Sequence, residues 1–458
     1  MPGQGGSWLW GALVDIMLLV AALAGAMVWR VGWPPPETNL QSLLVVAPIT
    51  FMALPFVFFG FGLYLRKPAR SIVRSALFAE SALFLVALAA AFWFRGFSSP
   101  RSVLVVGFLI HFIAVIGWRW GLQKTKHARA SRVTVVATRD EAVAVVEKLL
   151  YEPSGWYEIV RVIEPGQLLA EGDVALVGSD MVVAGPSIVG RTRLVLLETA
   201  VRAGARVFIM PELSDILMVG SVAGQIGDAP VFEIRPLMLT GRQLVGKRVL
   251  DLSLSIPLLI MLLPVMAAVA LAIKLFSPGP VFFTQKRVGL NGKEFVLYKF
   301  RTMVVDAEKR TGPVLATAND PRITPIGEFL RATRLDELPQ LINVVRGEMS
   351  LVGPRPERPY FVDQFCRELP DYDLRHLTPP GITGLAQVMG RYYTSAQDKL
   401  RFDLYYIRHY SIWLDLKILL LTLQAVISRE SATGVEASPT PQRMRAERLV
   451  LDRSGRVP

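Results

Sequence analysis

Long apolar runs fill the first 120 residues, whereas apolar and polar positions alternate over shorter distances in the rest of the chain. A bilayer core about 30 Å thick needs roughly 20 apolar residues in a helix. Four stretches reach or approach that length, and they predict a four-helix transmembrane bundle within residues 1–122: 8–29, 41–65, 75–94 and 102–118.

Two carboxylates, Asp15 and Glu80, interrupt these apolar stretches. Ionisable residues inside a membrane mark functional sites, unless they lie near an interface or pair within the bundle. Both interpretations stay open for this pair.

The basic residues of the loops predict the orientation of the bundle. They gather between the second and third stretches and after the fourth, whereas the other two loops hold only Arg30, Arg95 and Arg101. By the positive-inside rule, the N-terminus, the middle loop and everything after residue 120 lie in the cytoplasm.

Residues 131–235 alternate short apolar runs with helical patterns. The expected strands are 132–137 (RVTVVA), 173–178 (DVALVG) and 206–211 (RVFIMP), with helices over 141–150 and 191–204. This alternation predicts a small α/β domain with parallel strands. The turn after the first strand, Ala137-Thr138-Arg139-Asp140, lacks the glycines of a dinucleotide-binding loop. A scaffold or regulatory role is therefore favoured over nucleotide binding.

A fifth apolar segment, 252–273, carries Pro257 and Pro264 and has basic residues on both flanks. A proline removes one helical hydrogen bond and kinks the axis. Two half-helices of about 11 residues would each reach about 16 Å, roughly half the bilayer. We therefore expect a re-entrant membrane helix over about 248–275; the alternative is an ordinary fifth crossing.

The composition limits the possible classes of protein. For 458 residues, 52% apolar and 19% charged residues exclude both a wholly soluble globule and a disordered chain. The net charge of +12 favours anionic partners. A single cysteine, Cys366, and four scattered histidines exclude an internal disulfide and make a Cys/His metal site an unfavoured interpretation.

Basic residues recur beside glycine- and proline-rich turns after residue 277. Arginine forks bind phosphate with two hydrogen bonds, and no nucleic-acid-reading motif accompanies them. An anionic small substrate or a lipid phosphate is thus preferred over nucleic acid. The candidate residues are Arg287, Lys299, Arg301, Arg331, Arg334, Arg355, Arg358 and Arg391.

Asp336 and Glu337 form an acidic pair within this basic set. Taken alone, Leu-Asp-Glu-Leu is typical of the solvated first turn of a helix. Near several arginines, however, a carboxylate stays ionised and can attack phosphorus. A second carboxylate beside it can help to bind Mg²⁺ or transfer a proton.

Several motifs resemble the bacterial sugar transferase family, the monotopic phosphoglycosyl transferases: SPGPVFFTQKRVGLNG, KFRTM, LRATRLDELPQLINVVRGEMSLVGPRPE and PGITGLAQVMGR. The whole chain resembles the large form of these enzymes. The resemblance implies a membrane protein of mixed α and α/β class with a transmembrane bundle (1–122), a degenerate Rossmann-like α/β domain (131–235) and a C-terminal catalytic domain (244–430). The polar residues 431–458 are expected to be a disordered tail.

The resemblance implies roles for particular residues. Asp336 would be the nucleophile, which attacks the β-phosphate of a UDP-sugar, releases UMP and holds the sugar phosphate until undecaprenyl phosphate displaces it. Glu337 would support it through Mg²⁺ or a proton. The remaining expected site residues are Arg355 and Arg391 for phosphate and nucleotide, Lys247, Arg248 and Asp251 for the lipid phosphate, and Pro264 at the helix break, where Leu263 replaces the usual serine.

These expectations define an enzyme of the bacterial inner membrane with its catalytic domain on the cytoplasmic face, starting exopolysaccharide, capsule or O-antigen synthesis. Its partners would be a UDP-sugar of unspecified sugar, undecaprenyl phosphate, membrane lipids and a second copy in a homodimer. Residues 405–427 would lie along the membrane surface or form a core helix. Two other functions compete: an inactive export scaffold, and a glycosyltransferase that releases UDP.

Overall fold

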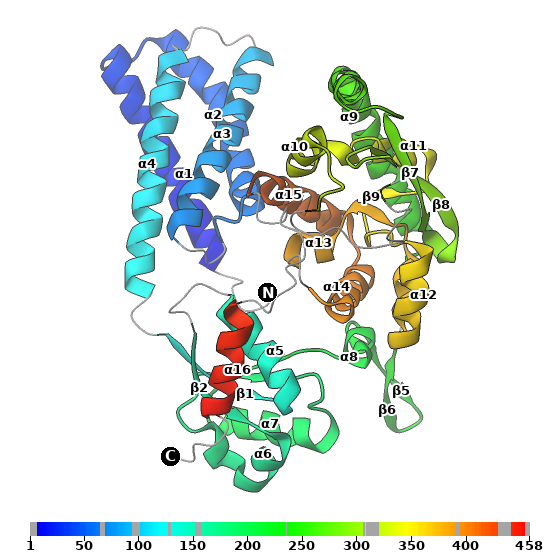
Figure 1. Ribbon diagram of the computed structural model, residues 1–458. Coiled ribbons are helices and arrows are strands. Elements are labelled where there is room, and N and C mark those ends of the chain that lie inside the picture. The colour runs from blue at the N-terminus through cyan, green and yellow to red at the C-terminus, as the bar shows by residue number, and fades with distance from the viewer. Residues whose placement is uncertain are drawn as a thin grey trace. The chain divides into compact units, whose positions relative to one another are not determined.

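A computed structural model describes residues 7–64, 69–93, 101–126, 130–151, 157–234, 236–305, 307, 320–390, 394–428 and 441–453 (Figure 1). The chain forms two compact units. The first is Met1–Val133 with Lys148–Val160 and Gly178–Asp180, and the second is Thr134–Glu147, Arg161–Val177 and Met181–Pro458.

Four long helices make up most of the first unit: α1 (Ser7–Val31), α2 (Glu37–Gly60), α3 (Ala69–Trp93) and α4 (Arg101–Lys126). They lie side by side, α1 against α4 and α2 against α3 (Figure 1). Within α1, α3 and α4, the segments Leu9–Val31, Ser75–Trp93 and Ser102–Leu122 are long and apolar enough to cross a membrane. The predicted stretch 41–65 corresponds to α2, which ends at Gly60; the described apolar part of this helix is Val46–Gly60.

The two carboxylates inside this bundle are paired with basic side chains. Arg119 forms an ion pair with Asp15 and donates a hydrogen bond to the Leu63 carbonyl (2.8 Å). His111 Nδ1 lies 2.8 Å from Glu80 Oε1. The structure thus favours pairing within the bundle for Asp15 and Glu80.

A small four-stranded sheet follows, in the order β2-β1-β3-β4. Its strands are β1 (Ser131–Val136), β2 (Tyr157–Ile163), β3 (Met181–Ala184) and β4 (Arg206–Ile209), and β3 and β4 are parallel. The helices of this region are α5 (Arg139–Leu150), α6 (Pro165–Glu171), η1 (Gly172–Leu176) and α7 (Gly190–Arg202).

One predicted strand of this region is wrong. Residues 173–178 form the short helix η1 and a turn rather than a strand, and Met181–Ala184 takes the strand position. Positive φ angles at Gly172 (54°) and Gly178 (76°) place turns at both ends of the DVALV segment. Its apolar side chains still reach the core, as Ala175 and Leu176 are fully buried.

The last region of the second unit begins with α8 (Leu213–Met218), the exposed antiparallel hairpin β5 (Val222–Ile226) and β6 (Ala229–Glu233), and the long helix α9 (Gly241–Phe276). A second hairpin, β7 (Phe282–Val288) and β8 (Glu294–Phe300), is closed by η2 (Leu290–Gly292) and lies beside α9 and α11 (Figure 1). The following elements are α10 (Pro325–Thr333), η3 (Leu335–Glu337), α11 (Gln340–Arg346), β9 (Ser350–Val352), α12 (Pro359–Glu368), η4 (Tyr372–Leu377), β10 (Gly381–Thr383), α13 (Leu385–Met389), α14 (Ala396–Arg408), α15 (Ile412–Ser428) and α16 (Pro441–Arg453).

Helix α9 is continuous, which differs from the two half-helices that we predicted. It begins with a capping box at Thr240 and runs through Pro257 and Pro264 for 36 residues. Each proline removes one backbone hydrogen bond, and the helical residues around it retain theirs. Large apolar side chains remain exposed along α9, including Ile260 and Leu271. Its apolar surface is therefore only partly covered by the rest of the chain.

Helix α15 has apolar side chains on two faces. Ile418 is fully buried in the core shared with α11 and α14, whereas Trp413 is 72% exposed. Residues 405–427 span the end of α14 and most of α15. One face of α15 packs in the core, as one expectation had it, and a position along the membrane surface stays a prediction.

A helix lies within the segment 431–458, which was expected to be a disordered tail. Residues Pro441–Arg453 form α16, in which Ala446 and Val450 are buried one helical turn apart. This i, i+4 spacing places both apolar residues on one face of α16, and that face packs against the rest of the chain although the segment is mostly polar.

Candidate active site

A tight turn presents Asp336 and Glu337 between two helices. Arg334 adopts a left-handed conformation (φ 59°), which ends α10 and begins η3. Leu335 and Leu338 pack against the cluster around Phe300, so apolar side chains anchor the turn on both sides of the carboxylates. Asp336 is only 7% exposed. This burial is inconsistent with the solvated first turn of a helix.

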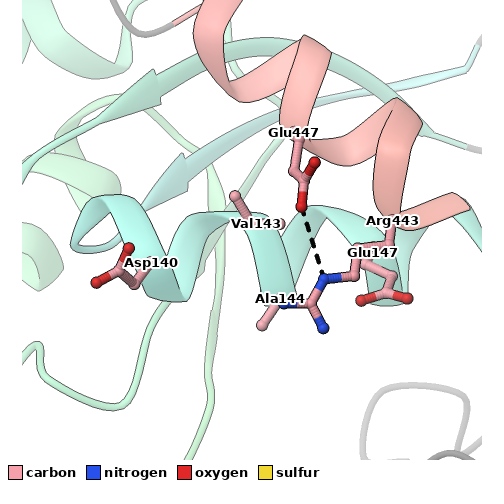
Figure 2. Close-up of a pocket in the computed structure, with 6 residues that line it drawn as sticks. All are labelled: Asp140, Val143, Ala144, Glu147, Arg443 and Glu447. Atoms are coloured by element: carbon pink, nitrogen blue, oxygen red, sulfur yellow. Dashed lines mark ion pairs between the residues drawn. The ribbon is translucent and has the colours of Figure 1, made fainter. Parts of the chain in front are cut away.

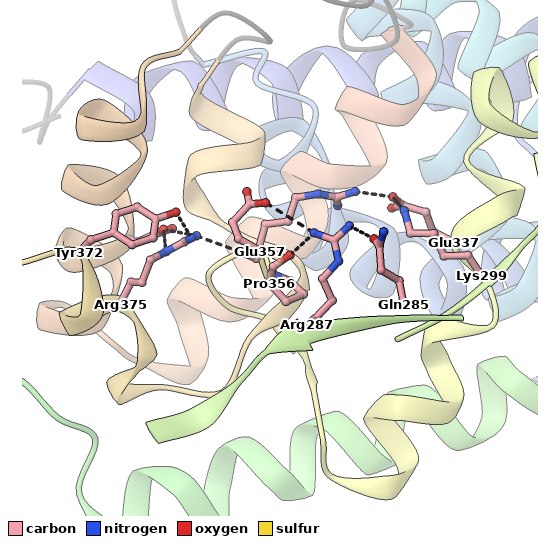
Figure 3. A network of polar contacts seen from close by, with 10 residues as sticks. Gln285, Arg287, Lys299, Glu337, Pro356, Glu357, Tyr372 and Arg375 are labelled. Carbon is pink, nitrogen blue, oxygen red and sulfur yellow. Dashed lines mark hydrogen bonds and ion pairs between the residues drawn. The ribbon is translucent and has the colours of Figure 1, made fainter. Parts of the chain in front are cut away.

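Two basic side chains converge on one oxygen of Glu337. Lys299 Nζ, from β8, lies 2.9 Å from Glu337 Oε1, and Arg355 Nη2, from the loop after β9, lies 2.6 Å from the same atom (Figure 3). The Asp336 carboxylate forms no hydrogen bond or ion pair with any described residue. The two adjacent carboxylates therefore differ: Glu337 pairs with two cations, whereas Asp336 has no such partner among the described residues.

The surroundings also separate the pKa values of the two carboxylates. Burial raises the pKa of Asp336, although the charge of Lys299 acts in the opposite direction. Burial alone would also raise the pKa of Glu337, but the charges of Arg355 and Lys299 outweigh it and hold that pKa well below its usual range. Glu337 thus remains ionised as the partner of two cations.

The backbone beneath Arg355 is fixed by a second network. Arg375 donates a hydrogen bond to the Arg355 carbonyl (3.0 Å), and its guanidinium pairs with Asp403 (2.8 Å) and Tyr372 (Figure 3). Two residues earlier in the loop, a Cβ at Gly353 would lie 2.3 Å from the Pro379 carbonyl oxygen. Glycine at this position allows the loop to pass close to its neighbour.

Arg287, from β7, lies on the other side of the same loop. It donates hydrogen bonds to the Pro356 carbonyl (3.0 Å) and to Gln285 Oε1 (2.7 Å), and it lies 3.5 Å from Glu357 Oε2 (Figure 3). Burial lowers the pKa of Arg287 to about 10. Lys299, Arg355 and Arg287 are thus among the predicted basic residues that the structure gathers around Glu337, and the charge of Arg334 acts on both carboxylates.

Two other predicted arginines have different surroundings. Arg331 donates a hydrogen bond to Thr302 Oγ1 (2.9 Å), and its charge acts on Asp336 from α10. Arg301 is buried and donates hydrogen bonds to the Ser277 and Pro278 carbonyls at the end of α9 (both 2.8 Å). These contacts give Arg301 a structural role, while its predicted role in substrate binding stays a prediction.

The three residues expected at the lipid phosphate also bind protein groups. Lys247 Nζ is buried and pairs with Asp415 (2.8 Å). Arg248 donates hydrogen bonds to the last carbonyls of α11, at Val344 (2.5 Å) and Val345 (2.7 Å), and Asp251 accepts from the Leu351 amide at the start of β9 (2.9 Å). They attach α9 to the fold; contact with lipid phosphate stays a prediction.

Arg391 lies outside the described residues. Pro264 lies inside α9 and does not end the helix.

The donor set suits a metal ion that arrives with phosphates. Among the described residues, no group of three or more His, Cys, Asp and Glu side chains is placed to hold a metal. Mg²⁺, however, commonly binds one or two carboxylates and completes its shell with substrate phosphates and water. Asp336 and the second oxygen of Glu337 provide such a pair.

Sequence reasoning missed Gln340, the first residue of α11. It is 2% exposed and lines a narrow cleft together with Arg287, Lys299 and Arg355. A buried polar residue directly after Leu338-Pro339, in an otherwise apolar helix start, was the available signal.

Another hollow lies at the surface of α5, where α16 packs against it (Figure 2). Its volume is about 320 Å³, and Arg443 and Glu447 of α16 form an ion pair across one helical turn (3.6 Å). None of the predicted site residues lines it. The hollow is bordered by Asp140, Val143, Ala144, Glu147, Arg443 and Glu447.

The described parts thus define a membrane protein with a buried acidic pair held by basic residues. Residues 242–429 match the bacterial sugar transferase family. The chain is 44% identical over 193 residues to the UDP-glucose:undecaprenyl-phosphate glucose-1-phosphate transferase of Caulobacter vibrioides, and this match covers 41% of the chain and 71% of that relative. The chain belongs to the bacterial sugar transferase family.

Two longer relatives are also similar to this chain. The transferase of the same name from Xanthomonas campestris is 41% identical over 244 residues, which cover 52% of this chain and 50% of the relative. The UDP-N-acetylgalactosamine-undecaprenyl-phosphate N-acetylgalactosaminephosphotransferase of Aeromonas hydrophila is 45% identical over 185 residues, 40% of this chain and 44% of the relative. The chain spans about half the length of these curated relatives.

Proposed function

We propose that this protein transfers a sugar 1-phosphate from a UDP-sugar to undecaprenyl phosphate, giving undecaprenyl-diphosphate-sugar and UMP. The observation that carries this proposal is the unequal acidic pair: Asp336 is buried and has no hydrogen-bond or ion-pair partner among the described residues, whereas Glu337 pairs with Lys299 and Arg355. The names of the relatives support the same two substrates, although they differ in the sugar.

The reaction that fits this pair has two displacements at one phosphorus atom. An oxygen of ionised Asp336 forms a bond to the β-phosphorus of the UDP-sugar, the bond from that phosphorus to the bridging oxygen breaks, and UMP leaves with the electron pair. A phosphate oxygen of undecaprenyl phosphate then attacks the aspartyl phosphosugar and releases the carboxylate. One diphosphate is exchanged for another, so the site chiefly needs positioning and charge neutralisation.

The basic residues supply that neutralisation from fixed positions. Lys299 and Arg355 lie within hydrogen-bond distance of Glu337, and substrate phosphates beside them would share both cations. Asp336 and Glu337 would hold Mg²⁺, which neutralises phosphate charge when it is bound. The network through Arg375 keeps the Arg355 backbone in place.

A lipid acceptor and a soluble donor must meet at a membrane surface. We propose that α9 enters the cytoplasmic leaflet of the bacterial inner membrane and returns to the same side. Both of its ends contact the catalytic region: Arg248 near the start binds α11, and Ser277 after the end binds Arg301. The two inner prolines can each bend the axis of a helix that stays continuous, and together with the exposed apolar side chains they support this arrangement.

We further propose that the small sheet is a degenerate Rossmann-like domain. The parallel pair β3 and β4 and the helix α7 between them support this assignment. The absence of glycines in the 137–140 turn favours a scaffold or regulatory role over nucleotide binding.

Incubation with a radiolabelled UDP-sugar and undecaprenyl phosphate tests the proposed function. We expect release of UMP and a labelled lipid product, and loss of both in Asp336→Asn. Asp363→Asn, an exposed aspartate on α12, is the matched control and should keep both. Release of UDP instead of UMP, or full turnover in Asp336→Asn, would contradict the proposal.

A further inference from the structure

A narrow cleft lies beside Glu337, on the side of its two cations. Its free volume is about 10 Å³, close to the space of one water-sized sphere. A base or a sugar ring does not fit into this space, but a single oxygen atom does. The cleft is lined by Arg287, Leu297, Lys299, Gln340, Arg355 and Pro356.

Two hydrogen-bond donors of this lining have no partner. Gln340 Nε2 and Arg287 Nε are both buried and form no hydrogen bond with any described residue. Buried donors of native proteins are nearly always paired, and an unpaired one destabilises the fold. Two of them at one small cleft indicate a missing acceptor.

Two acceptors beside the cleft are already used by other donors. Glu337 Oε1 accepts from both Lys299 and Arg355, and the Pro356 carbonyl accepts from Arg287 Nη1. The two unpaired donors are therefore suited to an oxygen that comes from outside the chain. Because three basic side chains line the cleft, an anionic oxygen fits better than a neutral one.

We infer that Gln340 is a substrate-contacting residue, which together with Arg287 forms a slot for one phosphate oxygen. This inference rests on the proposed function and deepens it, since it assigns a contact to a residue outside the acidic and basic set. The UDP-sugar and undecaprenyl phosphate both carry such oxygens. The slot recognises the chemistry they share, and the experiment distinguishes which of them supplies the oxygen.

Gln340→Met tests the slot, because methionine has a similar length and no donor. The full-length protein in detergent is measured in three ways: its unfolding temperature, the rise of that temperature on adding UDP, and the separate KM values for UDP-sugar and undecaprenyl phosphate. Gln364→Met is the matched control, since Gln364 is exposed on α12 and bonds Glu368 (3.1 Å).

The unfolding temperature of Gln340→Met should stay equal or rise, because no unpaired amide remains buried. One KM should increase about tenfold, the effect of one hydrogen bond to a charged group. An increase for UDP-sugar, with a smaller UDP-induced shift, assigns the oxygen to the donor. An increase for undecaprenyl phosphate alone assigns it to the acceptor.

A lower unfolding temperature with both KM values unchanged would overturn the inference, since Gln340 would then be structural or would hold only a water molecule. The UDP-induced shift requires no turnover, so it reports on the slot even if the proposed reaction is wrong. Conversely, full turnover of Asp336→Asn would refute the reaction and leave the Gln340 result standing.

Discussion

Replacing Arg355 with methionine removes one of the two cations that hold Glu337. Arg355 Nη2 lies 2.6 Å from Glu337 Oε1, and hydrogen bonds between charged groups contribute about 1.5–3 kcal/mol. The Arg355 side chain is 39% exposed, so solvent screening favours the lower end of this range. At 1.4 kcal/mol for each factor of ten, kcat/KM for the UDP-sugar should fall about tenfold from this contact alone.

The same change has a predictable effect on the pH dependence. The positive charge of Arg355 is the strongest influence that lowers the pKa of Glu337. Without it that pKa rises, so Glu337 takes up a proton at higher pH and releases Lys299. The acidic limb of the kcat/KM profile should therefore move to higher pH.

Steady-state kinetics with UMP detection across the pH range measures both effects. Arg355→Lys keeps the charge and should restore part of the rate and most of the acidic limb. Arg367→Met, which removes an exposed arginine of α12, is the matched control and should behave as the unmodified protein. An unchanged kcat/KM and an unchanged acidic limb in Arg355→Met would refute the role assigned to the pair.

Three further changes test neighbouring contacts. Asp415→Asn leaves the buried Lys247 charge without its partner and should lower the free energy of unfolding by about 3–5 kcal/mol in denaturant. Lys247→Met combined with Asp415→Leu should recover most of that loss. Equal losses in the single and double variants would contradict the pairing. Arg375→Met removes the hydrogen bond to the Arg355 carbonyl and should raise KM for the UDP-sugar more than it lowers kcat; a loss of stability with unchanged kinetics would limit Arg375 to folding. Glu337→Gln removes a negative neighbour that raises the pKa of Asp336. The acidic limb of the variant's remaining kcat/KM profile should therefore move to lower pH, and a move to higher pH would contradict this reasoning.

Sequence patterns predicted the features that depend on neighbouring residues. Apolar stretches with at most one carboxylate each and no Lys or Arg indicated the helices of the first unit. The long motifs around Asp336 indicated the family and the acidic pair. The apolar pattern could not show which of two runs forms the strand, because DVALV and MVVA are both short and apolar. Gly172 and Gly178 have positive φ angles, which place turns at both ends of DVALV and leave MVVA as the strand. A pattern of apolar residues carries no information on these backbone angles.

Residue types alone could not separate substrate-binding cations from structural ones. Arg301 and Arg248 have the same chemistry as Arg355, yet they bind the terminal carbonyls of α9 and α11. Lys247 forms an ion pair with Asp415, which lies 168 positions away in the chain. Only the folded arrangement shows which basic groups already have partners.

The continuity of α9 and the presence of α16 have similar explanations. A proline such as Pro264 weakens a helix by one hydrogen bond, and the packing of Val269 and Ile273 against Phe300 supports the helix after it. Two small residues, Ala446 and Val450, suffice to pack α16 within a polar segment. In both cases tertiary contacts outweigh the local sequence signal.

The central claim is that Asp336 bonds to phosphorus, and mass spectrometry of the protein incubated with UDP-sugar in the absence of lipid tests it most directly. The account predicts one sugar phosphate on the peptide that contains Asp336, an equal amount of released UMP, and loss of the adduct on adding undecaprenyl phosphate. Asp363→Asn should form the adduct and Asp336→Asn should not. An unmodified Asp336 peptide in a preparation that goes on to make lipid product would contradict the account.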